Sequence, residues 1–139
     1  MLQMGDLENK RELVIECKFD SLDQINPWLE SICVDYKIPD TRRFDISVCL
    51  YEAVANVIMY AFEQPLGQMI SINISLNTRS IEISVEDEGR LFNPMDHPEP
   101  ILPSSISEAA VGGHGISLIR NLSDRIQYSR SGQRNKLVM

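Results

Sequence analysis

Two polar side chains, Glu52 and Asn56, stand four residues apart in the otherwise apolar run YEAVANVI. On a helix this spacing places them side by side, with about 5–6 Å between their Cβ atoms. A carboxylate and a carboxamide in apolar surroundings cost free energy unless something partners them. Such a pair could act on a polar ligand, although the same spacing also occurs on the solvated edge of a helix.

Another carboxylate, Asp87, follows the alternating apolar residues of 81–85 and falls on the same face of the expected strand. Because a carboxylate that continues a buried face needs a hydrogen-bond donor, the amine of a bound ligand could be its partner. Gly89, two residues later, allows close backbone approach or a positive φ. An ordinary strand-to-turn transition explains the Asp-x-Gly pattern equally well.

A glycine cluster formed by Gly112, Gly113 and Gly115 precedes an apolar segment of helical spacing. The unpaired N–H groups and the dipole of a helix N-terminus attract phosphate, whereas a flexible hinge is the alternative explanation. The GGHG sequence lacks the Gly-Lys-Ser/Thr that ends a Walker A loop. The preceding segment, 91–111, contains four prolines and three serines, and a loop of this length argues for function rather than core.

Hydrophobic periodicity predicts the elements that must position these groups. The longest is a helix of about twenty residues over 41–62, capped by Asp40 or Thr41 and ended at Pro65. Its apolar stripe is expected to comprise Phe44, Val48, Tyr51, Val54, Ala55 and Ile58. Strict alternation over 70–76 and 81–87 predicts an antiparallel hairpin. The other expected elements are a strand over 13–19, helices over 21–37 and 116–122, and strands over 125–129 and 136–139.

This order of elements predicts an α/β fold, a two-layer sandwich in which a mixed, mostly antiparallel sheet carries its helices on one face. A chain of 139 residues is the length of a single domain, 1–139, in which 91–111 forms a long loop. With 43% hydrophobic residues, the domain can build a core without disulfides. Cys17, Cys33 and Cys49 are therefore expected to be buried free thiols.

The charge balance excludes several classes of partner. A formal net charge of −7 repels a phosphate backbone, so nucleic acid is not an expected partner. No run of residues is long and apolar enough to span a membrane, and the charged N-terminal segment does not resemble a signal peptide. We therefore expect a cytoplasmic protein.

The order of the three motifs resembles that of the GHKL ATPase superfamily, whose Bergerat ATP-binding fold is shared by gyrase, sensor histidine kinases and anti-sigma factor serine/threonine kinases. The matching segments are YEAVANVIMYAF, VEDEGRLFNP and GGHGISLIRNLSDRIQYSRSGQRNKLVM. The resemblance covers about 12–139. The compact chain looks most like the anti-sigma factor kinase branch.

The resemblance implies a role for each motif residue. Asn56 would coordinate Mg²⁺ at the phosphates of ATP, and Glu52 would be the general base. Asp87 would accept a hydrogen bond from the adenine amino group, and Gly89 would let the base approach. Segment 91–111 would be the ATP lid. The phosphate-binding residues would be Gly113, Gly115 and Ile116 at the start of the helix, with Arg120 as a further candidate for the γ-phosphate.

The implied function is an ATP-dependent protein serine/threonine kinase that phosphorylates an anti-sigma antagonist of the STAS type and regulates transcription by partner switching. A sigma factor is a further expected partner, and the resemblance also suggests a homodimer. Two alternatives stay open. The chain could be a non-catalytic, nucleotide-gated binding module, or the ATPase module of a sensor histidine kinase or larger regulator.

Overall fold

A computed structural model describes residues 9–96 and 115–139. Its five strands form one sheet in the order β1-β2-β3-β5-β4, and every neighbouring pair is antiparallel. The strands are β1 (Asn9–Glu16), β2 (Met69–Leu76), β3 (Ile81–Asp87), β4 (Gln127–Ser131) and β5 (Arg134–Val138). The α-helices are α1 (Ile25–Asp35), α2 (Asp40–Tyr60) and α4 (Gly115–Leu122), and short 3-10 turns lie at Phe19–Gln24 and Pro94–Asp96.

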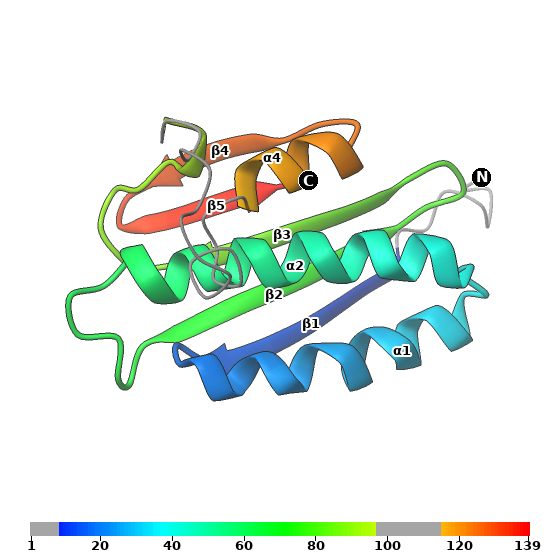
Figure 1. Cartoon of the computed structure of the whole chain (residues 1–139), viewed down its shortest axis with the longest axis horizontal. Helices are drawn as coiled ribbons and strands as arrows, with labels where there is room; N and C mark the ends of the chain where they lie inside the picture. Colours follow the sequence, from blue (N-terminus) through cyan, green and yellow to red (C-terminus); the bar gives the residue numbers. More distant parts are fainter. Residues whose placement is uncertain (1–8, 97–114) are drawn as a thin grey trace, which may run out of the picture.

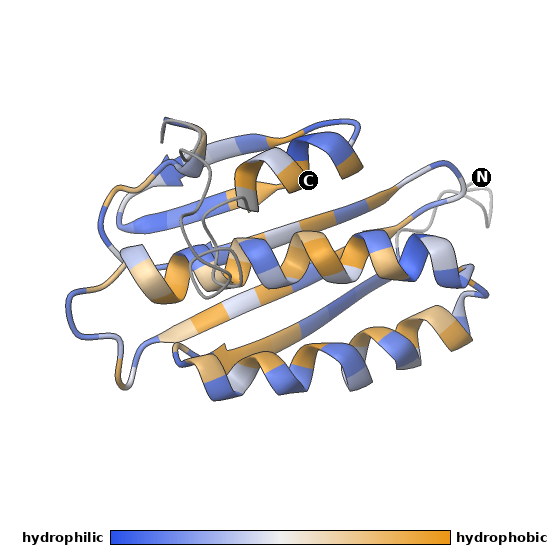
Figure 2. Cartoon of the chain, in the orientation of Figure 1, coloured by the Kyte–Doolittle hydropathy of each residue, from blue (hydrophilic) through white to orange (hydrophobic). Residues whose placement is uncertain are grey.

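The helices form a single layer over one face of the sheet (Figure 1). Ile70, Ile72 and Ile74 of β2 point into this interface and are fully buried. Hydrophobic residues gather on the helix surfaces and strands that meet there, as the orange segments in Figure 2 show. The predicted two-layer α/β sandwich is therefore confirmed, with a sheet that is antiparallel in all its described pairings rather than mixed.

The first strand and helix begin elsewhere than expected. β1 covers Asn9–Glu16 instead of 13–19, because it pairs along the whole length of β2, with Ile15 opposite Ile70. Phe19 consequently leaves the strand, begins a 3-10 turn and is exposed. Helix α1 starts only at Ile25, which places Pro27 in the first turn, where a missing N–H costs no helical hydrogen bond.

The end of α1 is closed by a pair of backbone hydrogen bonds. Ile38 N–H donates to Cys33 O at 2.9 Å, and Lys37 N–H donates to Val34 O at 3.4 Å. Lys37 has a φ of 54°, the left-handed position of this C-terminal motif, which glycine usually occupies.

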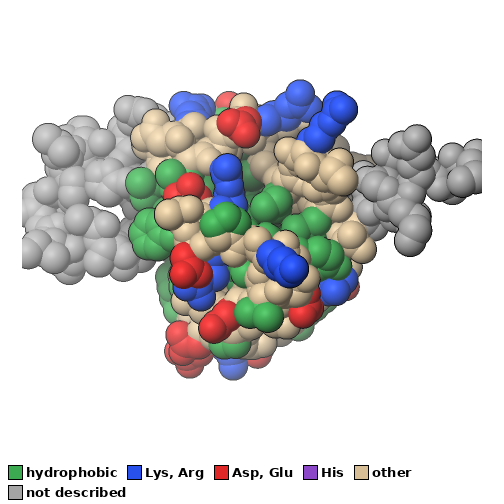
Figure 3. Space-filling view, turned by 90° about the vertical axis from the view of Figure 1, so that its right-hand side faces the viewer, with side chains coloured by type: hydrophobic (Ala, Val, Ile, Leu, Met, Phe, Trp, Pro, Cys, Tyr) green, Lys and Arg blue, Asp and Glu red, His purple; other side chains and the backbone are tan. Residues whose placement is uncertain are grey.

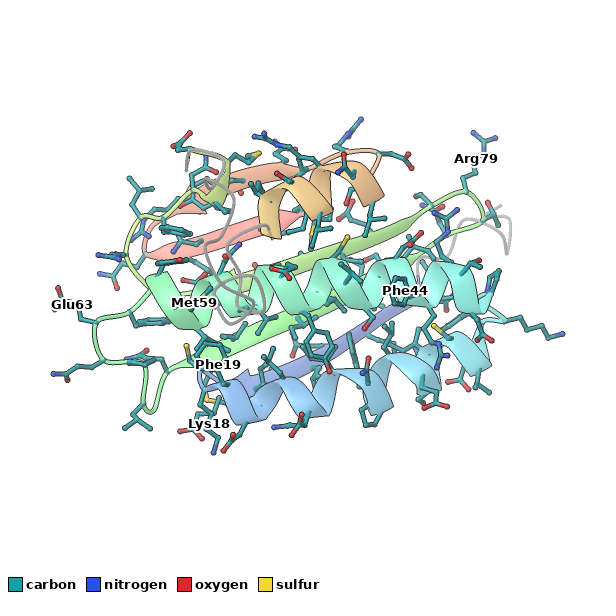
Figure 4. All side chains as sticks on the ribbon, in the orientation of Figure 1. Lys18, Phe19, Phe44, Met59, Glu63 and Arg79 are labelled. Atoms are coloured by element: carbon teal, nitrogen blue, oxygen red, sulfur yellow. The ribbon has the colours of Figure 1, made fainter. Side chains whose placement is uncertain are left out.

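Helix α2 has the predicted length, 21 residues, and buries Val54, Ala55 and Ile58 of the predicted apolar stripe. The stripe differs from the prediction in the N-terminal half of the helix. Phe44, expected in the apolar stripe, is 68% exposed and lies in the N-terminal half of the helix (Figure 4). The expected side-chain cap is also absent, because the capping position is Pro39 and Asp40 lies inside the first turn. The residues that α2 buries are Ile46, Cys49, Leu50, Ala53, Val54, Ala55, Asn56, Val57 and Ile58.

The opposite face of the sheet is polar. On it, Asn73 Nδ2 donates to Glu86 Oε2 at 3.2 Å, and Ser71 Oγ donates to Glu12 Oε2 at 3.2 Å. Basic and acidic side chains are interspersed on the end of the molecule drawn in Figure 3. None of the described helices is long and apolar enough to cross a membrane.

Candidate functional site

Asp87, the last residue of β3, is buried on the helix-facing side of the sheet with only 5% of its surface exposed. Its Oδ1 accepts two hydrogen bonds of 2.9 Å, from Gly89 N–H and from Asn135 Nδ2. Among the described residues, Oδ2 has no hydrogen-bond donor. The predicted continuation of the buried face is therefore confirmed, and one carboxylate oxygen stays available to a ligand.

Asn135 is a pocket residue that the sequence analysis missed. It lies opposite Asp87 in the β3–β5 pairing and is 3% exposed. Its Nδ2 donates to Asp87 and also to Arg90 O at 2.8 Å. Its Oδ1 accepts from Tyr128 Oη and, at 2.8 Å, from Arg130 Nη1. No short sequence motif links Asn135 to Asp87, because the two residues are 48 positions apart in the sequence.

A pocket opens beside Asp87 between α2 and the ends of β3 and β5. It holds about 350 Å³ of space that no atom fills, part of which is open solvent. Its walls are mainly apolar, and four polar side chains face it. The lining residues are Ala53, Asn56, Val57, Ala61, Val85, Asp87, Phe92, Pro94, Tyr128, Asn135 and Leu137. Apolar walls around a buried carboxylate suit a flat heteroaromatic ring that carries an amino group.

Asn56 reaches the same pocket from α2. It is 7% exposed, and its side chain makes no hydrogen bond to a described residue. Glu52 lies one turn nearer the N-terminus of α2, is half-buried, and is not among the described residues that line the pocket. The structure thus brings Asn56 and Asp87 to one cavity and places Glu52 just beyond its edge.

Of the two possibilities stated for Gly89, close backbone approach and a positive φ, the structure shows the first. Its φ is not positive, and a Cβ at this position would lie 2.4 Å from Ala61 O at the end of α2. The glycine therefore lets the chain after β3 pack directly on α2.

Arg90 continues this contact, because its backbone N–H donates to Ala61 O at 2.9 Å and its Nε donates to Tyr60 O at 2.7 Å. Phe92 stacks on Tyr60, with ring centroids 5.3 Å apart. Because the terminal carbonyls of α2 are bound in this way, the helix that carries Asn56 is fixed relative to Asp87.

The glycine cluster is only partly visible. Gly113 lies outside the described residues, as does 97–111 of the expected lid, whereas Gly115 begins α4. The side chain of Ile116 is buried, so a ligand would meet this residue through its backbone N–H.

Helix α4 runs antiparallel to α2 and packs against it (Figure 1). At its far end Cys49 Sγ lies 3.7 Å from Ser123 Oγ. The N-terminus of α4 therefore lies beside the C-terminal half of α2.

The described residues contain no cluster of three or more histidine, cysteine or acidic side chains that could hold a metal by itself. Mg²⁺ does not need one, since it is commonly held by one or two protein oxygens together with substrate phosphates and water. The amide oxygen of Asn56, buried in the pocket wall without a described partner, fits such a ligand.

The three cysteines are buried free thiols, as predicted. Burial raises the pKa of the Cys17 thiol to about 11, and the negative charge of Asp87 adds to the rise. Burial likewise raises the pKa of Cys33 and of Cys49, although the hydrogen bond with Ser123 partly offsets the effect at Cys49. These thiols are poor nucleophiles, so they are not candidates for catalysis.

Sequence comparison matches residues 15–139 to the histidine kinase-like ATPase domain family. A serine/threonine-protein kinase of Bordetella bronchiseptica, BtrW, is 28% identical over 112 residues, which cover 81% of this chain and 79% of the relative. An anti-sigma F factor of Clostridium perfringens is 27% identical over 96 residues, 68% of this chain and 69% of that protein. The serine-protein kinase RsbW of Listeria innocua is 26% identical over 87 residues, 60% of this chain and 55% of that protein.

The fold has a counterpart among solved structures. The crystal structure of the RsbU and RsbW domains of Rv1364c from Mycobacterium tuberculosis matches with a TM-score of 0.65 at 10% identity. The match covers 94% of this chain, which spans 31% of that longer chain. At this identity the likeness shows a shared fold.

Proposed function

The chain belongs to the family of histidine kinase-like ATPase domains, and on this premise we propose that it is a protein serine/threonine kinase that uses ATP with Mg²⁺. Its protein substrate would be an anti-sigma antagonist. The observation that carries the proposal is the buried carboxylate of Asp87, which faces an apolar pocket with one oxygen available.

Adenine is the base that this pocket suits best. Val57, Val85 and Leu137 offer apolar surface to a flat ring. Asp87 Oδ2 can accept a hydrogen bond from the 6-amino group, whereas the 6-oxo group of guanine or hypoxanthine would face this oxygen with a second acceptor. A hydrogen bond to a charged group in a buried site contributes about 1.5–3 kcal/mol.

The triphosphate would extend from the base toward the middle of α2 and the N-terminus of α4. Asn56, which lines the pocket one helical turn from Glu52, would hold Mg²⁺ through its amide oxygen. The metal would neutralise phosphate charge, which matters for a chain of net charge −7. The first backbone N–H groups of α4, at Gly115 and Ile116, are available to phosphate oxygens.

Glu52 is the proposed general base. It would accept the proton of a serine or threonine hydroxyl while that oxygen attacks the γ-phosphorus, and the bond from the γ-phosphorus to the β–γ bridging oxygen would break to release ADP. The half-buried position of Glu52, one helical turn from Asn56, supports this role because a protein hydroxyl could reach it from outside the base pocket.

The partner is proposed from the relatives. Two of them are named as serine or serine/threonine kinases and one as an anti-sigma F factor. An antagonist of the STAS type as substrate, a sigma factor as a second partner and a homodimer as the working form are consistent with those names. Cytoplasmic localisation belongs to the same proposal.

The test is phosphate transfer. The purified chain is incubated with γ-labelled ATP, Mg²⁺ and a purified STAS-type protein, and labelled serine or threonine is mapped on that protein. Label on one hydroxyl, lost when Mg²⁺ is chelated, is the expected result. Nucleotide-dependent binding of the same protein without label would instead identify a non-catalytic, nucleotide-gated binding module.

A further inference from the structure

Asn135 occupies the centre of a buried hydrogen-bond network that links three strands. Its Nδ2 donates to Asp87 Oδ1 at 2.9 Å, to Arg90 O at 2.8 Å and, more weakly, to Gly89 O at 3.4 Å. Its Oδ1 accepts from Arg130 and Tyr128 of β4. Arg130 Nη1 also donates to Gly89 O at 2.9 Å, so the segment 89–90 is hydrogen-bonded to β4 as well as to Asn135.

This network allows only one orientation of the Asn135 amide. A guanidinium has donors and no acceptor, so the atom of Asn135 that faces Arg130 must be the oxygen. The amide nitrogen then necessarily faces the carboxylate of Asp87 and the carbonyl of Arg90, which are acceptors. Reversing the amide would place two donors together at Arg130 and two acceptors together at Asp87.

We propose that Asn135 is a specificity-determining positioning residue, which holds the Asp87 carboxylate with Oδ1 turned inward and Oδ2 presented to the base, and that Arg130 and Tyr128 fix the amide that does so. The inference rests on the proposed recognition of adenine by Asp87. Asn135 lines the same pocket as Asp87, so its effect on the carboxylate should be measurable as a change in base preference.

The opposite face of the sheet provides a matched control. There Asn73 Nδ2 donates to Glu86 Oε2 at 3.2 Å, which is another strand-to-strand bond from an asparagine to a carboxylate. Asn73 is not among the described residues that line the pocket. Replacing each asparagine by aspartate removes the same N–H donor and introduces a carboxyl group beside another carboxyl group, at two places that differ in their relation to the pocket.

The experiment measures affinity for ATP and for inosine triphosphate, which has a 6-oxo group in place of the 6-amino group, by calorimetry with Mg²⁺. The wild-type chain should prefer ATP by about tenfold or more. Asn135→Asp places two carboxyl groups side by side, so one of them must keep a proton. A protonated carboxyl group can donate a hydrogen bond as well as accept one, so the preference for ATP should fall by about tenfold. Asn73→Asp should leave the preference unchanged.

Tyr128→Phe serves as a second variant in case Asn135→Asp does not fold, because it keeps the ring in the pocket and removes only the hydroxyl that donates to Asn135. It should reduce the ATP preference by about threefold, less than Asn135→Asp does, since Arg130 still holds the amide.

Two different results would contradict the positioning role of Asn135 and the recognition of adenine by Asp87. If the wild-type chain prefers ATP and every folded variant at Asn135 or Tyr128 keeps the full preference, the positioning role is wrong while adenine recognition stands. If the wild-type chain binds both nucleotides equally, adenine recognition by Asp87 is itself wrong, and the positioning role fails with it.

Discussion

Asp87→Asn tests base recognition most sharply, because the neighbours of Asp87 determine how the new amide must turn. The two donors at Oδ1, Gly89 N–H and Asn135 Nδ2, require an acceptor at that position. The introduced amide would therefore place its oxygen there and its NH₂ group where Oδ2 was. The ligand-facing atom changes from an acceptor to a donor, with almost no change in shape.

The size of the effect follows from this exchange. ATP loses a hydrogen bond to a charged acceptor, which is worth about 1.5–3 kcal/mol, or roughly 10-fold to 150-fold in the dissociation constant. A donor then faces the 6-amino donor, so the upper half of that range is the expected result. Inosine triphosphate gains a donor for its 6-oxo group and should bind the variant more tightly than it binds the wild-type chain.

The assay is calorimetric titration of both nucleotides into wild-type and Asp87→Asn protein, with circular dichroism to establish that the variant is folded. We expect opposite changes in affinity for the two nucleotides. Equal weakening of both would mean that the substitution disturbs the pocket as a whole. Unchanged affinity for ATP in a folded variant would refute the assignment of Asp87 to the base.

Three further predictions concern the stability of the fold. Gly89→Ala places a Cβ 2.4 Å from Ala61 O and should lower the free energy of unfolding by about 1–3 kcal/mol, measured from the urea midpoint; an unchanged midpoint would show that this contact is not tight. Lys37→Gly relieves a φ of 54° and should raise that free energy by about 0.5–1 kcal/mol, whereas a loss would mean that the lysine side chain itself stabilises the turn. Because the pKa of Cys17 is raised to about 11, its stabilising contribution is complete below about pH 9 and is lost as the pH rises toward 11. The stability difference between wild type and Cys17→Ala should therefore shrink over this range, and a constant difference would contradict it.

Much of the architecture could be predicted from local patterns. The alternation over 70–76 and 81–87 predicted the β2–β3 hairpin and the inward direction of Asp87, because side chains of a strand alternate between two faces. The order of elements and the length of α2 were likewise predictable from periodicity.

The misplaced elements were those that tertiary contacts decide. Phe44 has helical spacing with Val48 and Tyr51, but the N-terminal half of α2 buries Ile46, Cys49 and Leu50 instead, because packing against the sheet favours that neighbouring stripe. Phe19 continues the alternation of Ile15 and Cys17, yet β1 follows the length of β2 and ends before it.

The candidate site was predictable only where its residues lie in short motifs. Asn56 and Asp87 each stand out within a few residues of sequence, and the structure brings both to one pocket. Asn135 stands in a polar stretch that predicts no burial, and its importance comes from strand pairing with Asp87. Gly89 was correctly singled out, but its close contact with Ala61 depends on how α2 packs against the end of β3.

The measurement that tests the proposed kinase activity most directly is single-turnover phosphate transfer to the antagonist by wild-type, Glu52→Gln and Glu63→Gln proteins, with ATP affinity measured in parallel. Glu63 is an exposed glutamate beyond the C-terminus of α2 and provides the matched control (Figure 4). A positioned general base contributes about 10²–10⁴-fold, so Glu52→Gln should lose that factor in rate, keep its affinity for ATP, and differ in rate from an unaffected Glu63→Gln. Transfer at the wild-type rate by Glu52→Gln would contradict the mechanism.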